Sequence, residues 1–92
     1  MKSFLITYDL CRPGQDYPNL IEAIKRNVMS WAHPQLSVWI VKSTSTAVAI
    51  RDGLLPYLDR NDKLLVWELG SDGAWSNLGQ EISNWLLRNP AA

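Results

Sequence analysis

Three segments of the chain have the composition of β-strands and are apolar on both faces. They are residues 2–9 (KSFLITYD), 36–42 (LSVWIVK) and 63–69 (KLLVWEL), all rich in β-branched and aromatic residues. In the first segment, Phe4 and Ile6 point to one face of the strand and Leu5 points to the other. A sheet built from such strands needs cover on both faces. This requirement limits the folds that are open to the chain.

Apolar residues at helical spacing predict three helices between and after these strands. The first has a possible cap at Asp16 and carries Pro18 in its first turn. The second follows the Ser/Thr cluster at residues 43–46, and Pro56 ends or kinks it. The third spans residues 76–88. The apolar positions are Leu20, Ile21, Ile24 and Val28 in the first helix, Ala47, Ile50 and Leu54 in the second, and Leu78, Ile82, Trp85 and Leu86 in the third.

A short edge strand at residues 31–35 and a polar turn at residues 59–62 complete the order of elements. That order predicts an α+β fold, the ferredoxin-like split-βαβ sandwich, as a single domain over residues 1–92. We expect a four-stranded antiparallel sheet, with the helices that start near Tyr17 and Ser45 on the same face.

The second face of this sheet needs its own cover. The added C-terminal helix can cover part of it, and a second copy of the chain can cover the rest, so the sequence predicts a homodimer. We expect Trp67 and either Leu65 or Trp39 at the interface, depending on which face the helices take.

Composition and charge exclude several classes of protein. Nine basic residues balance nine acidic ones, so the whole chain has no long-range attraction for nucleic acid. A single cysteine, Cys11, and a single histidine, His33, exclude an internal disulfide and a Cys/His zinc cluster. No apolar run approaches the length of a membrane helix, and no secretion signal precedes the first strand, so we expect a cytoplasmic protein without membrane contact.

The first strand ends on a carboxylate, Asp9, and then enters a loop marked by Pro13-Gly14. One interpretation makes Asp9 a turn residue whose carboxylate accepts hydrogen bonds from backbone amides of residues 11–14. The other makes it a metal ligand or an acid/base group at the end of the sheet. The residues alone leave both interpretations open.

The segments "FLITYDL", "QLSVWIV" and "KLLVWEL" resemble the CRISPR-associated Cas-two family. Tyr8-Asp9 match a strand that ends in Tyr-Asp, and residues 35–39 match a Gln-x-Ser-Val-aromatic run in a middle strand. The chain more distantly resembles the virulence-associated protein D family of small ribonucleases. It also resembles short bacterial proteins labelled SinR-like, through "GQDYPNLIEAIK" and "LLPYLDRNDKLLVWEL", although no helix-turn-helix is found here.

The Cas-two resemblance implies a dimeric endonuclease that depends on a divalent metal and acts on RNA or DNA. It implies that Asp9 is catalytic and binds Mg2+ or Mn2+ close to the dimer two-fold axis. Such an ion needs few carboxylates when water and phosphate complete its shell. Ser37 would be a second catalytic residue on a neighbouring strand, and Arg12 would bind the phosphate of the substrate.

Each of these residues also has a structural interpretation. Ser37 can be a small strand residue, Arg12 a solvated loop charge, His33 a structural side chain and Cys11 a free thiol without a role. The five tryptophans can stack on bases, but most lie on apolar stripes, which favours packing in the core or at a dimer interface.

Two features of the chain depart from the family pattern. The loop and helix after the first strand are nearly balanced in charge, where relatives are basic, and a helix replaces the C-terminal strand. Two alternatives therefore stand beside the nuclease: a non-catalytic dimeric scaffold or adaptor, and a regulatory partner of the toxin-antitoxin type.

Overall fold

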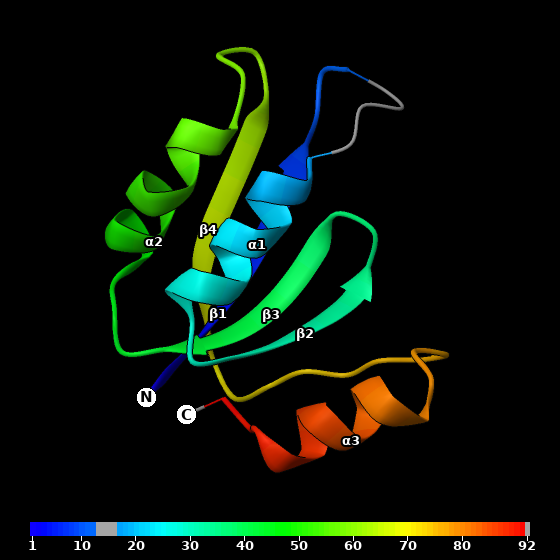
Figure 1. The fold of residues 1–92 in the computed structure, drawn as a ribbon. Helices are drawn as coiled ribbons and strands as arrows, with labels where there is room; N and C mark the ends of the chain where they lie inside the picture. Colours follow the sequence, from blue (N-terminus) through cyan, green and yellow to red (C-terminus); the bar gives the residue numbers. More distant parts are fainter. Residues whose placement is uncertain (13–16, 92) are drawn as a thin grey trace.

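A computed structural model describes residues 1–12 and 17–91 of the chain. The predicted Pro13-Gly14 loop and the predicted cap at Asp16 lie outside the described residues. The elements are β1 (Lys2–Asp9), α1 (Pro18–Asn27), β2 (Ser30–Gln35), β3 (Val38–Ser43), α2 (Ala47–Leu54), the short 3-10 helix η1 (Leu55–Tyr57), β4 (Lys63–Leu69) and α3 (Gln80–Arg88) (Figure 1). This is the predicted α+β, ferredoxin-like arrangement with an added C-terminal helix.

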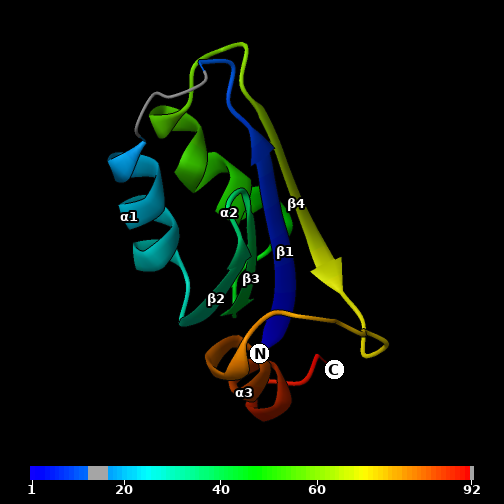
Figure 2. The same ribbon diagram turned by 90° about the vertical axis from the view of Figure 1, so that its right-hand side faces the viewer.

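The four strands form one antiparallel sheet in the order β2-β3-β1-β4. The central strand β1 pairs with β3 on one side and β4 on the other, so the first segment of the chain holds the two halves of the sheet together. β2 and β3 pair as the predicted central hairpin. Helices α1 and α2 lie on the same face of the sheet, as expected (Figure 2).

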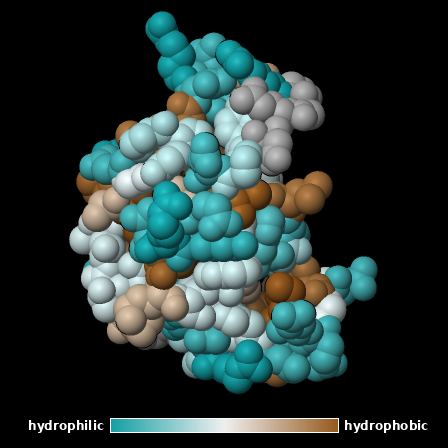
Figure 3. Space-filling view, in the orientation of Figure 1, coloured by the Kyte–Doolittle hydropathy of each residue, from teal (hydrophilic) through white to brown (hydrophobic). Residues whose placement is uncertain are grey.

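The core lies between these two helices and the sheet. Its buried side chains are Phe4, Ile6, Tyr8, Leu20, Ala23, Ile24, Trp39, Val41, Ile50 and Leu54. The strand residues of the core lie on the helix side of the sheet, because every second side chain along a strand points to the same face. The opposite surface of α1 is mostly hydrophilic (Figure 3), as an amphipathic helix on a sheet requires.

Trp39 is the largest fully buried side chain. Its indole N–H donates to the hydroxyl oxygen of Tyr8 at 3.1 Å, so the polar end of the ring is satisfied inside the core. The His33 ring stacks on it with centroids 3.8 Å apart, and Trp31 meets it edge-on at 5.3 Å. Trp39 therefore links β1, β2 and β3 on the helix side of the sheet.

The second helix has the predicted signals at both ends. Thr46 caps it, because its hydroxyl accepts a hydrogen bond from the amide of Ala49 at 3.1 Å. The helix ends at Leu54, and Pro56 lies in the 3-10 turn that follows. Gly53 permits close packing of α2 on α1, since a Cβ there would lie 3.1 Å from the side-chain oxygen of Asn27.

The third strand begins later than predicted, because Leu36 and Ser37 form the turn of the hairpin instead of its first strand positions. Gln35 pairs with Val38, which leaves two residues for the connection. Leu36 is 93% exposed as a result. The turn carries no Asn-Gly or Asp-Gly signal, so its β-forming residues resemble a continuous strand in the sequence.

The last helix also begins later than predicted, at Gln80 instead of residue 76. Asn77 and Gly79 have positive φ angles of 62° and 82°, which are incompatible with a continuous helix through this segment. Leu78 therefore belongs to the connection that crosses the sheet and not to the helix stripe. None of the helices that the structure describes is long and apolar enough to span a membrane.

The second face of the sheet, opposite α1 and α2, is covered only in part. The connection after β4 crosses it, and α3 runs back beside β2, where the Trp85 indole N–H donates to Ser30 Oγ at 2.8 Å (Figures 1 and 2). On β4, Leu65 is 46% exposed and Trp67 is 66% exposed. The helices take the Trp39 face, so Leu65 and Trp67 are the predicted interface residues that stay at the surface.

We expect Trp39→Ala to lower the free energy of unfolding by about 3–5 kcal/mol, because it removes a fully buried aromatic ring and the contacts of three strands. Chemical denaturation measures this change. The control is Leu36→Ala at the exposed hairpin turn, which should change stability by less than about 0.5 kcal/mol. Equal effects of the two substitutions would contradict the central role of Trp39.

Candidate functional site

Asp9 ends β1 on the second face of the sheet. Tyr8 points into the core, so the alternation of the strand directs Asp9 to the opposite side, where it is exposed. It lines a shallow hollow of about 190 Å³ together with Thr7, Lys63 and Leu65. The hollow continues into the exposed apolar surface of β4. Asp9 thus lies beside the part of the sheet that α3 leaves uncovered.

Lys63 is the direct neighbour of Asp9, since the two residues are paired in the register of β1 and β4. Cross-strand partners of opposite charge attract one another. The pair places one anionic and one cationic side chain at the same end of the sheet. This combination provides a ligand for a cation and a group that attracts phosphate.

In its described part, residues 10–12, the loop after β1 is held by Asp62. One oxygen of Asp62 accepts a hydrogen bond from the amide of Cys11 at 2.7 Å, and the other accepts one from the amide of Asp59 at 2.8 Å. Among the described residues, no hydrogen bond to the Asp9 carboxylate is found. The carboxylate that anchors the loop therefore comes from the predicted polar turn at residues 59–62.

These contacts shift the pKa values of three groups. The amide of Cys11 is the main cause that lowers the pKa of Asp62, because it stabilises the charged carboxylate. The pKa of the Cys11 thiol is raised by three causes. The largest is its hydrogen bond with Asp62, the second is desolvation, and the third is the negative charge of Asp62. Partial burial raises the pKa of Tyr17, and the charges of Asp62 and Asp59 raise it further.

Cys11, Asp59 and Asp62 bring three possible ligand atoms within 4.8 Å of one another. Both oxygens of Asp62 already accept amide hydrogen bonds, and the Arg12 guanidinium pairs with Asp59 at 3.2 Å. The cluster is accounted for as a loop anchor.

The other predicted site residues lie around the same end of the sheet. Arg12 is largely exposed but engaged with Asp59. Ser37 lies in the hairpin turn and not on a strand, as a continuous third strand would have required. Its backbone carbonyl accepts a hydrogen bond from the amide of Tyr8 at 3.2 Å, so Ser37 is brought next to the end of β1.

His33 and Cys11 have structural surroundings. His33 stacks on Trp39, and its Nε2 lies 2.9 Å from the carbonyl oxygen of Leu36, so it supports the hairpin. Cys11 is an exposed free thiol. The sequence analysis missed Lys63 and Asp62, because both meet the β1 end only through pairing with a segment more than fifty residues away. The polar turn was visible in the sequence, but its partner was not.

No model of a known protein family matches the chain, and no solved structure matches it.

We expect Asp62→Ala to lower the melting temperature at pH 7, because two backbone amides lose their acceptor. The folded-state pKa of Asp62 is lowered, so its contribution is present above the unfolded pKa of about 4 and is lost as pH falls through the folded pKa. The difference in melting temperature between wild type and variant should therefore shrink below about pH 4. Thermal unfolding across pH measures it.

The matched control for this series is Asp72→Ala, which removes an exposed carboxylate in the connection after β4. Its melting temperature should follow that of the wild type at every pH. A constant difference between wild type and Asp62→Ala down to pH 2 would contradict the assignment of Asp62 as a charged anchor.

Proposed function

We propose that the chain is a Cas-two-like homodimer in which two copies pack through the uncovered part of the second sheet face. The observation that carries the proposal is the position of Asp9: it is exposed, it lies beside the apolar residues Leu65 and Trp67, and Asp62 performs the structural role that would otherwise explain it. An exposed apolar surface next to a polar group is typical of an interface.

In such a dimer, the two Asp9 carboxylates bind one divalent cation, Mg2+ or Mn2+. Asp9 fits this ion because a carboxylate is a hard oxygen ligand, and because its oxygens accept no hydrogen bond from the rest of the described chain. When bound, the ion supplies charge neutralisation and an activated water for phosphodiester hydrolysis. The pairing of two like charges needs such a cation, since otherwise one carboxylate takes up a proton.

The residues around Asp9 support RNA or DNA as the substrate. Lys63 lies opposite Asp9 in the sheet and can hold a phosphate oxygen. The Arg12 side chain is 66% exposed and can contribute from the loop, although it must share its charge with Asp59. The Ser37 turn adds a hydroxyl near the same strand end, as its backbone contact with Tyr8 indicates.

The second candidate is a dimeric scaffold or adaptor without catalysis. Two observations favour it: Lys63 is the cross-strand neighbour of Asp9 within one subunit, and Arg12 forms an ion pair with Asp59. A regulatory partner of the toxin-antitoxin type would use the same exposed surface at Trp67 for another protein. These alternatives share the interface with the first proposal and differ in the role of Asp9.

The dimer is tested by Trp67→Glu. A biological interface on this face should bury on the order of 1,200 Å2 or more in total, and a charge at its centre should make the protein monomeric at micromolar concentration. Sedimentation velocity measures the mass. The control is Met29→Glu, which changes a side chain of the same 66% exposure outside this face and should leave the dimer intact. A monomeric wild type would overturn the proposal.

The metal and the reaction are tested by Asp9→Asn. We expect it to weaken Mn2+ binding at least about tenfold and to abolish cleavage of single-stranded RNA or duplex DNA, with the melting temperature unchanged. Binding by the wild type should weaken as pH falls, because the carboxylates must be ionised. Calorimetric titration and cleavage assays measure both.

The control for Asp9→Asn is Glu68→Gln, which removes an exposed carboxylate from the other face of β4 and should change neither binding nor cleavage. If the Asp9→Asn variant still cleaved the substrate, Asp9 would not be a catalytic residue. A dimer that binds nucleic acid, does not bind metal and does not cleave its substrate would establish the scaffold instead.

A further inference from the structure

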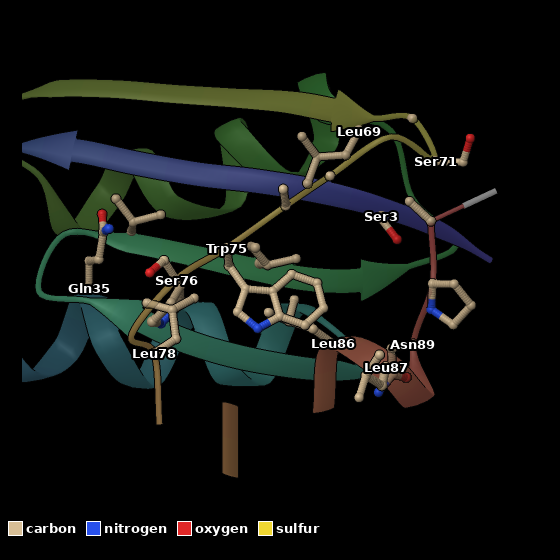
Figure 4. A pocket seen from close by; sticks show the side chains of 18 residues that line it. Ser3, Gln35, Leu69, Ser71, Trp75, Ser76, Leu78, Leu86, Leu87 and Asn89 are labelled. Carbon is tan, nitrogen blue, oxygen red and sulfur yellow. The ribbon is translucent and has the colours of Figure 1, made fainter. Parts of the chain in front are cut away.

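A groove separates the second sheet face from the segment that crosses it. Its floor is formed by β1 and β3, and its walls are formed by the connection after β4 and by α3 (Figure 4). It has a volume of about 480 Å³, which lies within the range of small-molecule sites. The groove shares no lining residue with the hollow at Asp9, although its Val38 is the strand partner of Thr7 in that hollow.

The lining of the groove is uncharged and mostly apolar, with polar side chains at Gln35, Ser71, Ser76 and Asn89 besides Ser3. Val38, Ile40 and Leu69 come from the strands, while Trp75 and Leu86 come from the crossing connection and α3. No charged side chain is found among the described residues that line it. A charged ligand would therefore lose its hydration without gaining a partner, which favours a neutral one.

Lys42 is a cation on this face, at the strand position paired with Ser3, and it is already engaged. Its side chain is largely buried, and its Nζ donates to the carbonyl oxygen of Pro90 at 2.6 Å. The contact fixes the end of the chain that follows α3 against the sheet. Because the ammonium group is engaged in this hydrogen bond, it is not offered to a ligand.

Ser3 supplies a polar group without a partner at the floor of the groove. The residue is 3% exposed, and its hydroxyl oxygen has no hydrogen-bond partner among the described residues. Buried polar groups in proteins are normally satisfied, so an unpaired hydroxyl that lines a cavity points to a group that arrives with a ligand. A hydroxyl both donates and accepts, so it suits either a hydroxyl or a carbonyl on the ligand.

Trp75 supplies a flat apolar surface over the same space. Its indole N–H donates to Ser83 Oγ at 3.1 Å, which ties the ring to α3. The side chain is 40% exposed, and its ring lies across the groove (Figure 4). A ring held in this way favours a planar aromatic partner through stacking.

We propose that this groove binds an uncharged aromatic small molecule that carries one hydroxyl or carbonyl group. The ring lies against Trp75 and the apolar side chains of β3, and the polar group forms a hydrogen bond with Ser3 Oγ. The inference does not depend on a metal, on nucleic acid or on the dimer.

Three naphthalene probes test the chemistry of the site: 1-naphthol, naphthalene without the hydroxyl, and 1-naphthoate with a charge. We expect 1-naphthol to bind saturably, with amide shifts in 1H-15N spectra at Ser3, Ile40 and Trp75. Naphthalene should bind about threefold to tenfold more weakly, the scale of one hydrogen bond, and 1-naphthoate more weakly still. Equal affinities of the three probes, or shifts confined to Leu65 and Trp67, would overturn the proposal.

Two variants test the named residues. Ser3→Ala should weaken 1-naphthol about threefold to tenfold and leave naphthalene unchanged, and it should fold normally because it removes an unpaired hydroxyl. Trp75→Ala should weaken both probes. The matched control is Trp67→Ala, an exposed tryptophan outside the groove, which should weaken neither. Full affinity in Trp75→Ala would overturn the proposal.

A dilution series of Trp67→Glu without probe tests the competing occupant, because this variant disrupts the proposed dimer through β4. If a second copy of the chain fills the groove, the amides of Ser3 and Ile40 should shift with protein concentration, and that result would overturn the small-molecule proposal. Constant positions of these amides across dilution would support it.

Discussion

The structure depends on the burial of Trp39 against the hydroxyl of Tyr8. A tryptophan can be buried completely only if its N–H finds a partner, and the tyrosine oxygen supplies one at 3.1 Å. The same hydroxyl lies 3.5 Å from the carbonyl of Leu36, so the pair also reaches the hairpin turn. Because β1 and β3 are adjacent at the centre of the sheet, this contact determines which face of each strand points toward α1 and α2.

Once Trp39 and Tyr8 point to the helices, strand alternation determines which side chains of each strand lie on the other face. On β1 it places Ser3 and Asp9 there, and on β4 it places Trp67 there. The apolar residues of that face then form two groups, of which one is covered and the other is exposed. The connection after β4 and α3 lie over the β3 side and leave a groove, whereas the β4 side stays exposed. The groove and the exposed surface are thus consequences of one core contact.

Most of the fold was predictable because its signals are local. The β-branched and aromatic composition of residues 2–9 and 63–69, the helical spacing of apolar residues and the Thr46 cap lie within or next to the elements that they specify. The two errors have different causes. Leu36 and Ser37 turn the hairpin without glycine or asparagine, so the sequence carried no signal for the turn. At the start of the last helix a signal was present, since Asn77 and Gly79 are residue types that accept positive φ, but the helical spacing of the apolar residues continues across them.

The candidate site was less predictable than the fold, since its residues meet through the sheet. Asp9 was visible as a strand-end carboxylate, but its neighbour Lys63 depends on the β1–β4 register. Asp62 anchors the loop at Cys11 from a distance of 51 residues along the chain. A single sequence carries no local trace of such a contact. The choice between Asp9 as an anchor and Asp9 as a ligand therefore depends on a different aspartate.

Ser3 and Asp9 stand at opposite ends of the same strand face, six residues apart, which corresponds to about 20 Å along β1. A ligand group bound to Ser3 Oγ is therefore remote from Asp9 within one subunit, although the groove itself extends along β3 to Val38, the strand partner of Thr7. The ligand would contact the crossing connection and α3, which bound the sheet face proposed for the second copy. Within one subunit the two spaces adjoin through the paired residues Val38 and Thr7. In the proposed dimer, the position of that connection relative to the partner adds a second route by which a ligand in the groove can influence Asp9.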